Sequence, residues 1–79
     1  MDPQARSDLR IQILGSALAL VRRRGPDPKA RIAGVAVDEA SLRRAMEQAY
    51  REAARLDDDA RERVRLVDLA NEIRPRSLV

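Results

Sequence analysis

The most regular pattern of apolar and polar positions covers residues 39–56. Apolar side chains recur there every three or four residues, at Leu42, Met46, Ala49, Ala53 and Leu56. This spacing places them on one face of an α-helix, and most of the remaining positions are charged. Asp38, directly before the run, is a residue type that caps helix N-termini. The pattern therefore predicts an amphipathic helix over residues 39–56.

A first helix is expected over residues 8–24. Ser7 is suited to an N-cap position, and Gly25 followed by Pro26 is a helix stop signal. The apolar positions of this segment spread over a much wider arc than the apolar stripe of an ordinary surface helix. We therefore expect this helix to contact neighbours on more than one side.

A third helix is expected over residues 60–74. Asp59 and Glu62 have the spacing of a capping box, and Pro75 ends the segment. The apolar residues form two stripes on roughly opposite sides of the helix. One stripe consists of Leu66, Leu69, Ala70 and Ile73, and the other of Ala60, Val64 and Val67.

The stretch 25–38 has no clear periodicity and contains Pro26, Pro28 and Gly34. We interpret it as a linker that is a loop with at most one helical turn. The predicted fold is therefore all-α: one small domain, residues 1–79, with three helices. The second and third helices form a helical hairpin around the acidic turn at Asp57 to Asp59.

Composition excludes several kinds of site. The chain has no His and no Cys, so it cannot build a Cys/His metal site, a disulfide framework or a His-based catalytic triad. The adjacent carboxylates of Asp57, Asp58 and Asp59 lack further ligands at the spacing of a calcium loop. We expect no cofactor, no metal and no catalytic residue. No apolar run approaches the ~20 residues of a membrane span, so we expect a cytoplasmic protein.

The outward apolar stripes provide the candidate interface. Three helices of this size expose more apolar surface than they can bury among themselves, so we expect a protein partner. A second copy of the chain and a separate helical-repeat protein both remain open as partners. The candidate interface residues are Leu9, Leu20, Ala60, Val64 and Val67, with Asp68 and Asn71 in a polar strip between the stripes of the third helix.

DNA binding is the alternative hypothesis. The chain has 16 Lys and Arg against 13 Asp and Glu, a formal net charge of +3. The one dense basic cluster is Arg22 to Arg24, which can contact phosphates. The same cluster ends the first predicted helix, where cations complement the helix dipole. We rank nucleic acid below protein as a partner, because no helix carries polar readout residues beside a recognisable turn.

Two stretches resemble a known family. Tyr50, Ala53, Leu56, Asp57 and Asp58 resemble the closing half of a tetratricopeptide repeat, with Asp58 in the place of the usual Pro. Residues 62–77, ERVRLVDLANEIRPRS, resemble the C-terminal end of the bacterial protein kinase G family of serine/threonine kinases. Residues such as Ile32, Leu42 and Glu47 fall at matching spacings upstream. After Gly34 the family tends to carry aromatics and a Pro, whereas this chain has Val35-Ala36-Val37.

The resemblance implies tetratricopeptide-repeat-like packing and a role in protein association, since this region of such kinases is implicated in self-association and in placing the kinase against partners. It does not imply kinase activity for these residues. The chain contains no Gly-rich phosphate loop, no His-Arg-Asp and no Asp-Phe-Gly. We therefore expect a non-catalytic helical protein-interaction module, either a separate product or part of a kinase.

Overall fold

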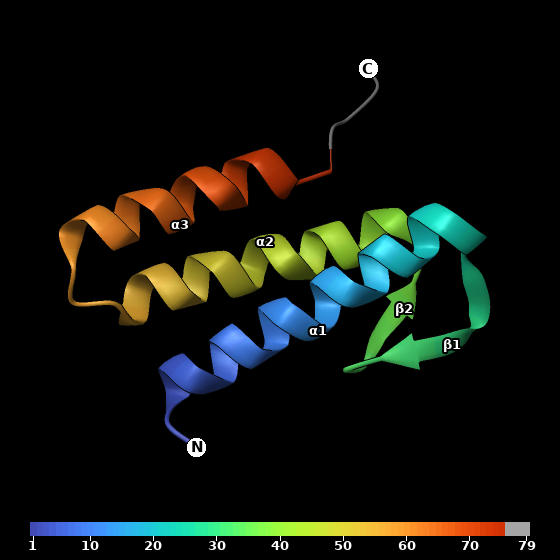
Figure 1. Cartoon of the computed structure of the whole chain (residues 1–79), viewed down its shortest axis with the longest axis horizontal. Coiled ribbons are helices and arrows are strands. Elements are labelled where there is room, and N and C mark those ends of the chain that lie inside the picture. Colours follow the sequence, from blue (N-terminus) through green and yellow to red (C-terminus); the bar gives the residue numbers. More distant parts are fainter. Residues whose placement is uncertain (76–79) are drawn as a thin grey trace.

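The computed structural model describes residues 1–75, which form three helices and a β-hairpin (Figure 1). The elements in chain order are α1 (Pro3–Arg24), β1 (Asp27–Ile32), β2 (Val35–Val37), α2 (Glu39–Leu56) and α3 (Ala60–Ile73). The molecule measures 38 × 35 × 17 Å, so it is flat, with its shortest dimension about half of the other two. The last residue of the family resemblance, Ser77, lies outside the described residues.

Helix α1 begins at Pro3, five residues earlier than the sequence predicted. Asp2 is the N-cap, and its Oδ1 accepts a hydrogen bond of 2.8 Å from the backbone N–H of Ala5. Proline at the first helical position is favourable because its missing N–H would have no partner in the helix. Ser7, the predicted N-cap, is instead a buried residue inside the helix. The predicted end is confirmed, with Arg24 last and Gly25 at a φ of 87°.

The stretch 25–38 is not the loop that we predicted, because β1 and β2 pair there as an antiparallel hairpin. Ile32 pairs with Val35 across a two-residue turn, in which Ala33 and Gly34 have φ values of 51° and 77°. Positive φ at both central residues is the geometry of a type I′ turn, which matches the twist of paired strands. The fold is therefore mostly helical with a small sheet, rather than all-α.

Helix α2 covers the predicted residues and lies between the other two helices in Figure 1. Its N-cap, Asp38, accepts hydrogen bonds from the backbone N–H of Ser41 at 2.7 Å and from the Ser41 hydroxyl at 2.9 Å. These contacts satisfy a backbone donor that the helix itself leaves without a partner. They also hold the pKa of the Asp38 carboxyl below its ordinary value of 3.8, the backbone N–H of Ser41 contributing most.

Helix α3 begins as predicted, after the N-cap Asp59, and ends one residue before the predicted end. The backbone N–H groups of Arg61 and Glu62 donate to Asp59 Oδ1. The reciprocal half of the predicted capping box is absent from the described hydrogen bonds. The Glu62 carboxylate pairs instead with Arg65, and Asp57 Oδ1 accepts from the Asp59 backbone N–H at 2.8 Å.

Buried apolar side chains form two clusters, and both include residues of α2. The first cluster joins α1, β2 and α2 and contains Leu14, Ala17, Leu18, Val21, Val37, Leu42, Ala45 and Met46. The second cluster joins α2 and α3 and contains Ala53, Ala54 and Leu66. Tyr50 is half-buried and packs against both clusters, as expected for a core ring.

Candidate protein-interaction surfaces

The outer side of α1 exposes a row of large aliphatic side chains. Leu9, Ile13 and Leu20 are 42%, 39% and 38% exposed, although the opposite side of the same helix is buried in the first cluster. The separations of four and seven residues keep these side chains close in angle around the helix. Together with Ile32 of β1 they line an open groove of about 430 Å³. We call Leu9, Ile13, Leu20 and Ile32 the α1 surface.

The sequence identified only part of the α1 surface. Leu9 and Leu20 were predicted to face outwards and do so. Ile13 was missed, although it lies close in angle to both of them around the helix. Ile32 was missed because the stretch that carries it was interpreted as a loop, whereas pairing of β1 with β2 brings it beside α1.

A second groove runs between α2 and α3. It has a volume of about 480 Å³, and Val64 and Val67, which are 61% and 37% exposed, contribute apolar surface to it. We call it the α2–α3 groove, and it is lined by Arg51, Ala54, Arg55, Arg63, Val64, Val67 and Asp68. The structure thus brings together three of the predicted interface residues, Val64, Val67 and Asp68.

The other two predicted residues of α3 lie outside this lining. Ala60 is the first residue of α3 and is exposed. The Asn71 side chain is exposed as well, but its Oδ1 accepts a hydrogen bond of 2.8 Å from Arg51 Nη2 on α2. Asn71 was predicted as a partner-interface residue, but this hydrogen bond links α3 to α2 within the chain.

Arginine side chains surround the α2–α3 groove, and each has an anchor inside the chain. Arg51 Nη2 lies 2.9 Å from Glu47 Oε2, and Arg55 pairs with Glu52. Arg63 Nη1 donates to the backbone carbonyl of Asp57 at 2.8 Å. These contacts hold the guanidinium groups beside Val64 and Val67, and each guanidinium keeps further N–H donors for an additional acceptor.

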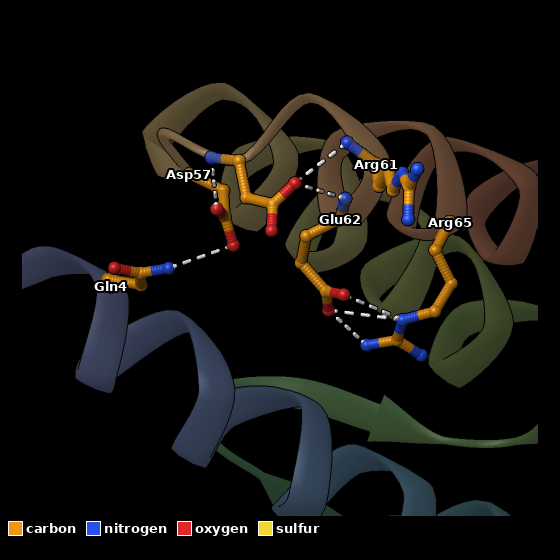
Figure 2. Close-up of polar contacts among 6 residues, drawn as sticks. Gln4, Asp57, Arg61, Glu62 and Arg65 are labelled. Atoms are coloured by element: carbon orange, nitrogen blue, oxygen red, sulfur yellow. Dashed lines mark hydrogen bonds and ion pairs between the residues drawn. The ribbon is translucent and has the colours of Figure 1, made fainter.

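The acidic turn between α2 and α3 is tied to α1 and to itself. Figure 2 shows Gln4 reaching from α1 towards Asp57, and Gln4 Nε2 donates to Asp57 Oδ2 at 3.1 Å. The same view shows the Glu62 carboxylate facing the Arg65 guanidinium. That hydrogen bond from Arg65 holds the pKa of Glu62 below its ordinary value of 4.5. The hydrogen bonds of Asp57 therefore hold the turn between α2 and α3 in one conformation and attach it to α1.

Within residues 1–75, no group of three or more acidic side chains is arranged to hold a metal ion. Every buried side-chain nitrogen or oxygen of the described residues has a hydrogen-bond partner. In the same part of the chain, no helix combines the length and apolar character that a membrane span requires. Among the grooves of the described residues, the α1 surface and the α2–α3 groove are the two that contain predicted interface residues together with large exposed aliphatic side chains.

The basic cluster at the end of α1 is partly engaged within the chain. Arg22 Nε lies 3.5 Å from Glu39 Oε1, and Arg43 Nη1 lies 3.5 Å from the same oxygen. Arg22, Arg23 and Arg24 form the last turn of α1, directly before Gly25. This placement agrees with a role in stabilising the helix C-terminus through its dipole.

Comparison with known proteins identifies one family. The family described as protein kinase G tetratricopeptide repeat matches residues 2–77, which is nearly the whole chain. The same comparison finds no curated protein and no solved structure that matches this chain. The match covers α1 and the whole hairpin as well as the two helices that carry most of the resemblance.

Proposed function

Because the chain belongs to the protein kinase G tetratricopeptide-repeat family, we propose that it is a non-catalytic helical module that binds other proteins. The observation that carries this proposal is the exposure of Leu9, Ile13 and Leu20 side by side on the outer face of α1. Clustered aliphatic side chains on the surface of a small domain mark sites of association. The proposal includes a cytoplasmic location and a resemblance to the C-terminal region of a protein kinase G, whether the chain is a separate product or part of a kinase.

The apolar character of the α1 surface supports a helical partner. Its groove is lined by uncharged residues: Leu9, Gln12, Ile13, Ser16, Ala17, Leu20 and Ile32. A row of large side chains beside small ones such as Ser16 and Ala17 provides ridges and grooves for a second helix. The partner that we propose is either a second copy of the chain or another helical-repeat protein.

The first test measures self-association. Sedimentation velocity over a range of concentrations compares the chain with the double variant Leu9→Asp/Leu20→Asp, which places charge in the α1 surface. We expect the association constant to fall by at least about tenfold, because an unpaired carboxylate in an apolar contact is costly. Ala19→Asp is the matched control, since Ala19 is an exposed residue of α1 outside the surface. Circular dichroism checks that all variants remain folded.

The second test covers partners other than a second copy. Immobilised chain and immobilised double variant are used to capture proteins from the native host. Proteins that bind the chain and its Ala19→Asp variant but not the double variant support the proposal. A chain that stays monomeric and captures nothing in this pattern contradicts it. Retention of a duplex DNA oligonucleotide with steep salt dependence would instead favour the nucleic-acid alternative.

A further inference from the structure

The α2–α3 groove differs from the α1 surface in its charge. Three of the seven residues that line it are arginines, and Asp68 is the one acidic residue among them. The groove of the α1 surface has no charged residue in its lining. The two grooves therefore have similar volumes but offer a ligand different chemistry, because arginines line one of them and the other is uncharged.

The apolar floor and the basic rim of the groove lie close enough to be used together. Val64 and Val67 are on α3, and Ala54 contributes from α2. Arg55 extends from α2 and Arg63 from α3 around the same groove. A segment lying in this groove would meet aliphatic surface at its centre and guanidinium groups on both sides.

The existing contacts of these arginines leave them able to bind a further carboxylate. Glu52 accepts from Nε and Nη2 of Arg55, so Nη1 can still donate. Arg63 uses Nη1 to reach the Asp57 carbonyl, so its Nε and Nη2 can still donate. The Asp57 contact satisfies a carbonyl but does not neutralise the Arg63 charge.

On this charge complementarity, we propose that the α2–α3 groove binds an acidic amphipathic segment of a partner protein. An aliphatic side chain of the segment packs on Val64 and Val67. One carboxylate of the segment pairs with Arg63, and another hydrogen-bonds with Nη1 of Arg55, whose charge Glu52 already balances. The inference rests on the proposed function, because it assumes that the chain binds proteins, but it uses a different surface. Apolar contact supplies most of the affinity, and the charges set the orientation and the salt dependence of binding.

The probe is a fluorescein-labelled peptide of leucine and glutamate, about three helical turns long, in which leucines occupy one face. Its control has lysine in place of every glutamate. Fluorescence anisotropy measures the affinity of both for the chain. We expect the lysine peptide to bind at least about tenfold more weakly, and the affinity of the glutamate peptide to fall as salt is added.

Variants then locate the site. Val64→Ser removes apolar contact at the most exposed valine of the groove, and we expect the glutamate peptide to bind about fivefold more weakly. Leu9→Ser, the corresponding change on the α1 surface, should leave the affinity unchanged. Arg63→Glu should weaken binding by about tenfold. Arg61→Glu is its matched control, since Arg61 is an exposed residue of α3 outside the groove.

The results of these experiments distinguish failure of this inference from failure of the proposed function. Equal affinity for the two peptides, no binding of either, or unchanged binding to both Val64→Ser and Arg63→Glu overturns the inference. Binding of a duplex DNA oligonucleotide that the glutamate peptide does not compete with, and that Arg63→Glu abolishes, also overturns it. Should Leu9→Asp/Leu20→Asp prove to have no effect on association while the peptide binds as expected, only the proposed role of the α1 surface fails.

Discussion

On the side of α2 that faces α1 and the hairpin, the buried residues include Leu14, Leu18, Leu42 and Met46. On the side that faces α3, Leu66 packs against two alanines of α2. Arginines add polar contacts on this second side. Arg43 Nε donates to the Ile73 carbonyl at 2.8 Å, and its Nη2 donates to the Glu72 carbonyl at 3.4 Å.

This difference indicates that α1 and α3 are attached by different kinds of interaction. Burial of large aliphatic side chains is the main favourable contribution between α1 and α2. Between α2 and α3 the buried side chains are mostly alanines, and arginine hydrogen bonds to helix carbonyls and to Asn71 stabilise the contact. We therefore expect α3 to open locally at lower free energy than the α1–α2 pair.

The largest expected effect comes from the first cluster. Leu42 is fully buried, and Leu42→Ala should lower the free energy of unfolding by about 2–5 kcal/mol, because it removes apolar contact and leaves a cavity. Urea denaturation followed by circular dichroism measures the change. Leu20→Ala is the control on the exposed side of α1, with an expected effect of about 0.5 kcal/mol or less. Equal effects of the two substitutions would contradict the assigned burial.

A smaller and local effect is expected at the end of α3. Arg43→Met retains much of the side-chain stem but removes both hydrogen bonds to α3 carbonyls, which should cost about 1 kcal/mol. Hydrogen exchange should become faster in the last turn of α3 and stay nearly unchanged in α1. Arg44→Met serves as the control at an exposed neighbouring position. Uniformly faster exchange across the chain would show that α3 does not open independently.

A stabilising change is expected on the other side of α2. Gly15 lies inside α1, and a Cβ added there would meet the Met46 Cε at 3.6 Å, an ordinary van der Waals distance. Gly15→Ala should therefore raise stability by about 0.5–1 kcal/mol, since alanine loses less backbone entropy in a helix. Thermal unfolding measures the shift. Gly25→Ala should have the opposite sign because of its φ of 87°, and a destabilised Gly15→Ala would refute the packing described for α1.

The smallest expected effect is a change in how the free energy of unfolding depends on pH under acidic conditions. The pKa of Asp38 is lowered in the folded chain by the backbone N–H and hydroxyl of Ser41, so the ionised cap stabilises the fold above the ordinary value of 3.8. This stabilisation is lost as the pH falls below 3.8 and through the folded-state pKa. Stability measured by urea titration between about pH 2 and 5 should fall less steeply in Asp38→Asn than in the parent chain. Identical slopes would exclude a contribution from this cap.

The sequence predicted α2 in full because three independent signals agree there. The apolar stripe, the Asp38 cap and the acidic turn after Leu56 all indicate the same helix, and the structure confirms the range. For α1 two capping signals competed. Asp2 followed by Pro3 formed the N-terminus, and Ser7 became a helical residue.

The hairpin could not be predicted from local propensity. Asn-Gly is the usual type I′ pair, but the turn here is Ala33-Gly34, and alanine rarely adopts a positive φ. Tertiary contacts support this conformation, since Val37 is buried in the first cluster and Arg10 Nη1 donates to the Ala33 carbonyl at 3.3 Å. Without the hairpin, the sequence also could not show that Ile32 extends the α1 surface.

The α2–α3 groove was partly predictable. The outward stripe of the third helix gave Val64 and Val67, and the polar strip gave Asp68. The arginines contributed by α2 were not predicted, because their position beside α3 depends on how the two helices pack. Helical periodicity specifies faces of one helix, whereas a groove requires the relative placement of two.

The packing of Tyr50 against both clusters has a practical consequence for spectroscopy. The chain has one Tyr and neither Trp nor Phe, so its near-ultraviolet absorption and its intrinsic emission arise from a single ring. That ring senses the environment on both sides of the central helix, and no added label is needed. Detachment of the last helix and complete unfolding would therefore alter the same optical signal in turn, at two denaturant concentrations.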